Sequence, residues 1–254
     1  MKIAVAVKVV HDDQDILIMG DQSLDYSKAR ADISMYDLNA IEAAVRLKEA
    51  NEGSSVVAIT VGPAYINDSK LKKSILARGV DELYLVADDS LDGYSSRQTA
   101  AALAKLLAGV EGGWDLVICG DGSADEYAQQ VDVQLGVALD VPVINAVTAL
   151  EAEAGGASII ATRTLESSIE KVRLPLPAVL SVSPEVALPR IAGMKDILAA
   201  GKKPMIEASA IDKGINEPAT LEATAPLAPE PTPRAQQIYE SVDEFVAAAA
   251  AVLR

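Results

Sequence analysis

The chain has very few residues of the kinds that form disulfides, bind metals or act as catalytic bases. Its 254 residues include one cysteine, Cys119, and one histidine, His11. A single cysteine excludes an internal disulfide and fits a reducing compartment. Because Cys119 ends an apolar run, we expect it to be a small buried residue, and His11 to be a solvated loop residue. With no nucleophile–base set and no metal-ligand spacing, the sequence predicts no catalytic residue and no metal site.

Aromatic residues and positive charge are also scarce. Phe, Trp and Tyr make up 4% of the chain, although half of its residues are apolar, so Ala, Val, Leu and Ile must form the core. Lys and Arg number 22 against 37 acidic residues, which gives a net charge of −15. This charge argues against nucleic acid as a partner. No apolar stretch is long enough for membrane insertion, and without a signal-peptide pattern the expected location is cytoplasmic.

The stretch from Asp115 to Pro142 combines a strand, a glycine turn and a helix. Residues 116–119 are an apolar run typical of a buried parallel strand. Gly120-Asp121-Gly122-Ser123 interrupts the run, and apolar residues then recur at helical spacing from Tyr127 to Ala138. This arrangement aims backbone N–H groups at an anion and predicts a phosphate-bearing ligand; an ordinary strand-to-helix turn is the alternative. Because carboxylates crowd the turn, main-chain donors and side-chain amides such as Gln129 and Gln130 must hold the anion.

Strand and helix patterns alternate up to Pro142. Strands are predicted at 3–7, 56–61 and 83–86, with helices beginning near Leu38 and spanning about 67–78 and 95–107. Ser34 and Asp37 have the spacing of a capping box, and Glu42 and Arg46 are expected to form an exposed i,i+4 pair. The alternation predicts an α/β fold with a mostly parallel sheet flanked by helices.

The pattern changes after Pro142. Residues 157–164 and 169–174 read as an antiparallel hairpin added to the sheet, and 178–182 as another buried strand. We expect two parts: residues 1–205 as a nucleotide-binding α/β domain, and residues 206–254 as an extended C-terminal arm. The arm has a Pro-rich spacer and an amphipathic helix over about 238–253, which docks on its own domain or on a partner. The irregular 188–195 segment reads as a connector, with a contact loop as the alternative.

Blocks spread over residues 1–205 resemble the small (beta) subunit of electron transfer flavoproteins, of the Fix/carnitine-pathway type. They are KIAVAVK, SMYDLNAIEAAVRLKE, AITVGP, CGDGSADEYAQQV, LPLPAVLSVS and PRIAGMKDIL followed by GKKP, in that order. The resemblance implies an adenine-nucleotide-hydrolase-like (Rossmann-type) domain and a heterodimer with a large alpha subunit. It also implies an FAD shared with that subunit, and AMP or a second FAD held by this chain.

The resemblance also implies site residues, by position in the motifs. The nucleotide of this chain is expected at strand ends and helix starts: Ala6, Ser34, Met35, Tyr36, Asp37, Val61, Gly120, Ser123, Ala124, Asp125, Ala128, Gln129, Gln130, Val131 and Asp132. Two stretches depart from the family pattern, which usually has Asn-Pro-Phe at residues 34–36 and a glycine where Asp132 stands. The 188–195 segment is expected to dock an acyl-CoA-type dehydrogenase through Pro189, Arg190, Ile191, Met194 and Lys195.

The expected function is therefore that of an electron carrier subunit without catalytic side chains of its own. Two alternatives stay open at this point. One is a nucleotide-hydrolysing enzyme on the same fold, although Val9-Val10-His11-Asp12 offers no Ser- and Gly-rich pyrophosphate loop after the first strand. The other is a stand-alone, universal-stress-like nucleotide-binding module, which has no need of the C-terminal arm.

Overall fold

A computed structural model describes residues 1–153, 155–219, 224–233 and 236–252. By their contacts these residues form two units, the first comprising Met1–Leu17 and Asp25–Thr224 and the second Ile18–Leu24 and Ala225–Arg254. Residues 206–219, expected in the C-terminal arm, thus belong to the first unit. A functional boundary after residue 205 stays a prediction.

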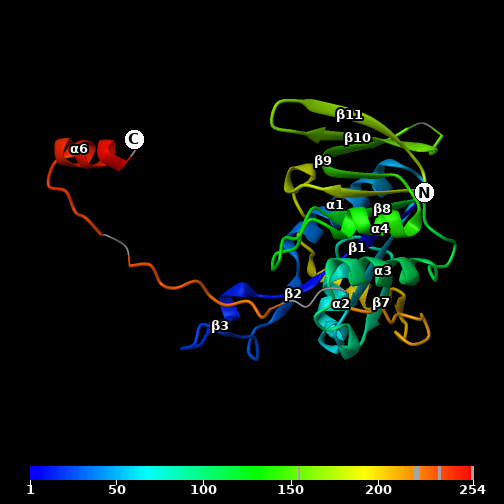
Figure 1. Ribbon diagram of the computed structural model, residues 1–254. Helices are drawn as coiled ribbons and strands as arrows, with labels where there is room; N and C mark the ends of the chain where they lie inside the picture. The colour runs from blue at the N-terminus through cyan, green and yellow to red at the C-terminus, as the bar shows by residue number, and fades with distance from the viewer. Residues whose placement is uncertain (154, 220–223, 234–235, 253–254) are drawn as a thin grey trace. The chain divides into compact units, whose positions relative to one another are not determined.

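The first unit is built on a nine-stranded sheet in the order β11-β10-β9-β12-β8-β1-β6-β7-β13 (Figure 1). Strands β12, β8, β1, β6, β7 and β13 run parallel, β9 is parallel to β12, and β10 is antiparallel to both β9 and β11. The bounds of the sheet strands are β1 Lys2–Ala6, β6 Ser55–Gly62, β7 Glu82–Ala87, β8 Leu116–Gly120, β9 Val143–Ala152, β10 Ser158–Thr164, β11 Ile169–Pro175, β12 Ala178–Val182 and β13 Met205–Glu207.

Two short ladders and the helices complete the structure. The ladders pair β2 (Val9–His11) with β5 (Ala31–Ile33) and β3 (Leu17–Ile18) with β4 (Leu24–Asp25). The α-helices are α1 Met35–Ala50, α2 Ser69–Leu76, α3 Ser96–Leu107, α4 Val131–Leu139, α5 Met194–Ala200 and α6 Val242–Val252, and short 3-10 turns are η1 Asp13–Asp15, η2 Ala64–Asn67, η3 Asp89–Leu91 and η4 Pro184–Val186. No helix in the described ranges is both long and apolar enough to cross a membrane.

Helices cover both faces of the sheet because alternate residues of each central strand point to opposite sides. Ile3 and Val5 of β1 pack in one core cluster with residues of α1, α2 and α5. Ala4 and Ala6 pack in the other cluster with residues of α3 and α4. This two-sided burial confirms the predicted α/β architecture with an added hairpin.

The structure also corrects several local predictions. Strand β9 and edge strand β13 were not predicted, and the helix expected from Asn67 is a 3-10 turn followed by α2, which Asp68 caps. His11 is a half-buried strand residue instead of a solvated loop residue. Its ring lies 4.9 Å from that of Tyr65 and 5.3 Å from that of Tyr26. Among the described residues, no group of three or more potential ligands could hold a metal.

The second unit contains the terminal helix, α6. Ala228 N donates a hydrogen bond to Gln22 O over 2.9 Å, and Leu227 forms a β-bridge with Ser23. Helix α6 exposes Val242 and Phe245. Leu253, expected on the same apolar face, lies outside the described residues.

Candidate functional site

The carboxyl ends of three adjacent strands define the candidate nucleotide site. Strand β1 lies between β8 and β6. After β1 the chain adds β6 and β7 on one side of it and then returns to add β8 on the other side. This reversal of strand order is the position where open α/β sheets bind ligands. Ala6, Val61 and Gly120 stand at or next to the ends of these strands, so the fold brings together the expected strand-end residues.

Asp37, in the first turn of α1, connects two of these strand ends. Its Oδ2 accepts a hydrogen bond from Lys8 N over 2.7 Å, and its Oδ1 accepts one from Gly120 N over 3.2 Å. Gly120 is required by this contact, because a Cβ there would lie 2.7 Å from Asp37 Oδ1. The predicted capping box is wrong: Ser34 precedes α1 but makes no side-chain cap bond, and Asp37 turns to the sheet instead.

Burial gives Asp37 an unusual protonation equilibrium. Loss of solvation raises the pKa of its carboxyl to about 7, while the two backbone donors and the nearby Lys8 ammonium oppose the rise. The two donors are neutral N–H groups, so they compensate only partly for taking the carboxylate out of water. Asp37 is therefore a structural acid whose charge changes near neutral pH.

The other residues before and within the first turn of α1 also lie near the end of β1. Ser34 N donates to Lys8 O over 3.0 Å. The Ser34 side chain is fully buried, and its Oγ has no hydrogen-bond partner in the described part of the chain. Met35 is exposed, and the Tyr36 ring lies 4.9 Å from the ring of Tyr127. A buried hydroxyl without a partner fits a polar group of a bound ligand.

The turn after β8 leaves a row of backbone donors free. Tyr127 N donates to Ser123 O and Gln134 N donates to Gln130 O. Between these bonds, the N–H groups of residues 128–133 donate to no oxygen of the described residues. They belong to Ala128, Gln129, Gln130, Val131, Asp132 and Val133 at the start of α4, where an anion is favoured.

The helix begins later than its apolar spacing indicated. Tyr127 and Gln129 have φ values of 47° and 54°, in the left-handed region that non-glycine residues rarely adopt. Tyr127 packs over Gly122, where a Cβ would clash with the ring. The four residues before Val131 therefore form an irregular turn and not the first turn of the helix.

The acidic residues around the turn are mostly engaged within the chain. Lys8 Nζ lies 2.8 Å from Asp125 and 3.4 Å from Ser123 Oγ. Asp132 is buried and accepts a hydrogen bond from Ser181 Oγ on β12, whereas Ala124 is exposed. Lys8 and Ser181 belong to no motif that the sequence reveals, because a residue at a strand end and a serine within a strand have no distinctive spacing.

Together these observations fit a nucleotide phosphate. Within the described residues, the site supplies N–H donors and a buried hydroxyl that have no partner. The carboxylates of Asp125 and Asp132 already accept hydrogen bonds from Lys8 and Ser181. Cys119, beneath the turn, is buried, and burial raises the pKa of its thiol well above the ordinary value. As predicted, it is a core residue and not a nucleophile.

The second candidate site is the 188–195 segment with the start of α5. Leu188, Ile191 and Met194 are exposed by 82%, 96% and 74%. Lys195 is exposed and Pro189 is half-buried. Arg190 differs from its neighbours, because its guanidinium hydrogen-bonds to Glu42 and Glu49 of α1. The segment therefore combines an outward apolar surface with a charged inner side.

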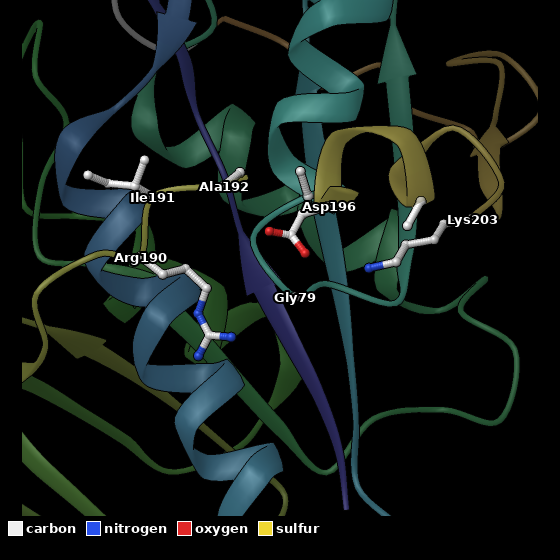
Figure 2. Close-up of a pocket in the computed structure, with 8 residues that line it drawn as sticks. Gly79, Arg190, Ile191, Ala192, Asp196 and Lys203 are labelled. Atoms are coloured by element: carbon white, nitrogen blue, oxygen red, sulfur yellow. The ribbon is translucent and has the colours of Figure 1, made fainter. Parts of the chain in front are cut away.

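A small cavity of about 130 Å³ lies behind this segment (Figure 2). Its lining includes Arg190, Asp196 of α5, Lys203 and Gly79, the residue after the α2 region that has φ of +98°. In Figure 2 the side chains of Arg190 and Ile191 point in different directions. A second, open cavity of about 470 Å³ has a charged lining that includes Asp12, Arg30 and Lys70.

Comparison with known families places the fold in one group of proteins. The family model described as the electron transfer flavoprotein domain matches residues 23–213, which is well over half of the chain. The match includes α1, the β8–α4 turn and the 188–195 segment, and thus both candidate sites except the end of β1.

Proposed function

The chain belongs to the electron transfer flavoprotein family, whose members are flavin-associated electron carriers, and on this premise we propose that it is the small (beta) subunit of a cytoplasmic heterodimer. In this proposal the large alpha subunit and this chain share the FAD that carries electrons. This chain itself holds AMP or a second FAD. The family type proposed is that of the Fix/carnitine pathways.

The observation that carries the proposal is that the N–H groups of residues 128–133, beside the end of β8, donate to no oxygen within the described ranges. These donors would hold the nucleotide phosphate, with Gln129 and Gln130 beside them. Ser34 and the ends of β1 and β6 at Ala6 and Val61 would contact the ribose or base. No residue of the chain has to transfer a proton, because a bound flavin supplies the redox chemistry.

The proposed partner, to or from which the FAD carries electrons, is an acyl-CoA-type dehydrogenase docked through the 188–195 segment. Exposed Ile191 and Met194 are suited to an apolar recess on that partner, since aliphatic and Met side chains adapt to such surfaces. The C-terminal α6, whose apolar residues Val242 and Phe245 are exposed, is proposed to contact the large subunit.

The test is co-expression of this chain with a matching large subunit. The expected product is a yellow heterodimer that accepts electrons from an acyl-CoA dehydrogenase. Chromatography of the released nucleotides then counts flavin and AMP per heterodimer and separates AMP from a second FAD. A colourless monomer that still binds nucleotide after removal of residues 207–254 would contradict the proposal and support a stand-alone nucleotide-binding module.

A further inference from the structure

The 188–195 segment is attached to the rest of the first unit along one helix. Asn39 Nδ2 of α1 donates to Pro184 O over 3.2 Å and to Ala187 O over 2.8 Å. Further along α1, Glu42 and Glu49 accept hydrogen bonds from Arg190. Asn39, Glu42 and Glu49 lie three and seven residues apart, so they share one side of the helix.

Arg190 is the centre of a compact ion-pair cluster, which we define as Arg190, Glu42, Glu49 and Arg46. Arg190 Nε lies 2.7 Å from Glu42 Oε2, and Arg190 Nη1 and Nη2 lie 2.8 and 3.1 Å from the two oxygens of Glu49. Arg190 N donates to Glu42 Oε2 over 3.2 Å, and Arg46 Nε donates to Glu42 Oε1 over 2.7 Å. The cluster is neutral in total charge, and its guanidinium geometry matches bidentate carboxylate binding.

Burial separates this cluster from an ordinary surface ion pair. The Glu42 side chain is only 5% exposed and that of Arg190 is 31% exposed. Arg190 Nη1 would also lie 3.3 Å from a Cβ at Gly79, so the guanidinium packs closely against the chain that follows α2. A planar, multiply bonded Arg held between packed elements restricts its own backbone more than an exposed Lys pair does.

The far end of the segment has separate attachments. Asp196 accepts a hydrogen bond from Gly193 N over 2.8 Å at the start of α5. Lys203, after α5, donates to Leu76 O and Val80 O near the end of α2. Between the two ends stand Ile191 and Ala192, and the apolar side chain of Ile191 is almost fully exposed.

From this arrangement we infer that Arg190 is a positioning residue: the ion-pair cluster fixes the 188–195 segment in the conformation that presents Ile191 and Met194 to the partner. This inference rests on the proposed docking function. It reassigns Arg190, which the sequence placed among the docking contacts, to the inner side of the segment. A segment ordered in advance loses less conformational freedom on binding, so the cluster acts on affinity and not on the electron-transfer step.

The first test is amide hydrogen exchange on the full-length chain. Arg190→Gln is expected to accelerate exchange at residues 188–193 by about tenfold or more, with little change at residues 194–200, which have their own cap. Arg190→Lys and Glu49→Gln, which keep part of the cluster, are expected to give smaller accelerations. Lys105→Gln is the matched control, because it removes an ion pair with Glu217 on another part of the unit.

The second test measures electron transfer from a purified acyl-CoA dehydrogenase to the heterodimer. Arg190→Gln should raise the KM for the heterodimer by about tenfold and leave kcat nearly unchanged. Arg190→Lys should recover part of the loss, and Lys105→Gln should resemble the wild type. Unchanged exchange at residues 188–193 in Arg190→Gln would overturn the inference, as would a fall in kcat with constant KM.

The two tests separate this inference from the proposed function. If the wild-type heterodimer accepts no electrons from the dehydrogenase and Ile191→Ser changes nothing, the docking function fails, and with it the role of Arg190 in docking. The exchange measurement is independent of the partner, so it still decides whether the cluster orders the segment.

Discussion

Helix α1 contributes a buried carboxylate to each candidate site, and the two carboxylates differ in the groups that bind them. Asp37, at the candidate nucleotide site, accepts hydrogen bonds from two neutral backbone N–H groups, and burial raises its pKa to about 7. Glu42, under the 188–195 segment, receives two guanidinium groups; burial acts to raise its pKa, but Arg190 and Arg46 outweigh burial and lower it. With neutral donors, a buried carboxyl is partly protonated at physiological pH, whereas cationic donors keep it ionised.

The difference also separates what each site offers to a ligand. Around Asp37 the structure provides backbone donors and a buried hydroxyl, which suit a small polar molecule. Around Glu42 the charged side chains of the cluster pair with one another, and the outward side presents the exposed apolar side chains of Ile191 and Met194. These properties agree with the proposed nucleotide at the first site and the proposed partner protein at the second.

The largest expected effect is the pH dependence caused by Asp37. Its pKa in the folded chain, about 7, exceeds the unfolded value near 3.8, so the folded chain holds a proton that the unfolded chain releases between these pH values. The stabilisation is complete below about pH 4. It decreases by about 1.4 kcal/mol per pH unit between about pH 4 and pH 7, and it is lost once the pH has risen through about 7. Urea unfolding of wild type and Asp37→Asn from pH 5 to 8 measures it. Parallel curves for the two proteins would refute the assignment.

The contribution of Glu42 to stability should change with pH in the opposite direction. Because its pKa is lowered, its stabilisation is present at neutral pH and is lost as pH falls below the unfolded value. Glu42→Gln is expected to cost about 3 kcal/mol at pH 7, since a neutral amide replaces the buried carboxylate that bonds to both Arg190 and Arg46, and hydrogen bonds to charged groups contribute about 1.5–3 kcal/mol each. Glu49→Gln is the control, because the Glu49 side chain is 54% exposed and should cost less than about 1 kcal/mol. Chemical unfolding at pH 7 and pH 4 compares the two.

Gly120→Ala tests the close approach between the end of β8 and α1. The added Cβ would lie 2.7 Å from Asp37 Oδ1 and 2.9 Å from Tyr36, so α1 must shift, at a cost of about 2 kcal/mol. Nucleotide retained by the purified heterodimer should fall in parallel. Gly20→Ala is the matched control, because no atom lies within 4 Å of a Cβ at that position; equal losses in both variants would contradict the prediction.

The smallest expected effect on stability comes from Ile191→Ser. Its side chain is 96% exposed, so the free energy of unfolding should change by less than about 0.5 kcal/mol. Electron transfer from the dehydrogenase should nevertheless weaken, which is measured as a raised KM for the heterodimer. Full activity of the double variant Ile191→Ser and Met194→Ser would contradict the prediction, because it would show that these apolar side chains do not contact the dehydrogenase.

The local sequence pattern was sufficient to predict most strands and helices of the fold, but it predicted less of the geometry of the two candidate sites. The apolar runs at β1, β6, β7 and β8 and the hairpin β10–β11 follow from periodicity, because buried strands have a recognisable composition. Strand β9 was not predicted, because buried and exposed residues do not alternate regularly along it. The start of α4 was misplaced because the left-handed Tyr127 is held by packing on Gly122, which no spacing rule contains.

The sequence by itself determined the alternating elements, the core composition and the family, since each depends on the order and spacing of residues along the chain. Only the tertiary structure decided what the carboxylates of α1 bind. Asp37 meets Gly120 across 83 positions of the chain, and Glu42 meets Arg190 across 148. A short acidic side chain can cap a helix, pair with Arg or accept backbone N–H groups with similar local geometry. The choice among them depends on which strand or loop the fold brings within about 3 Å.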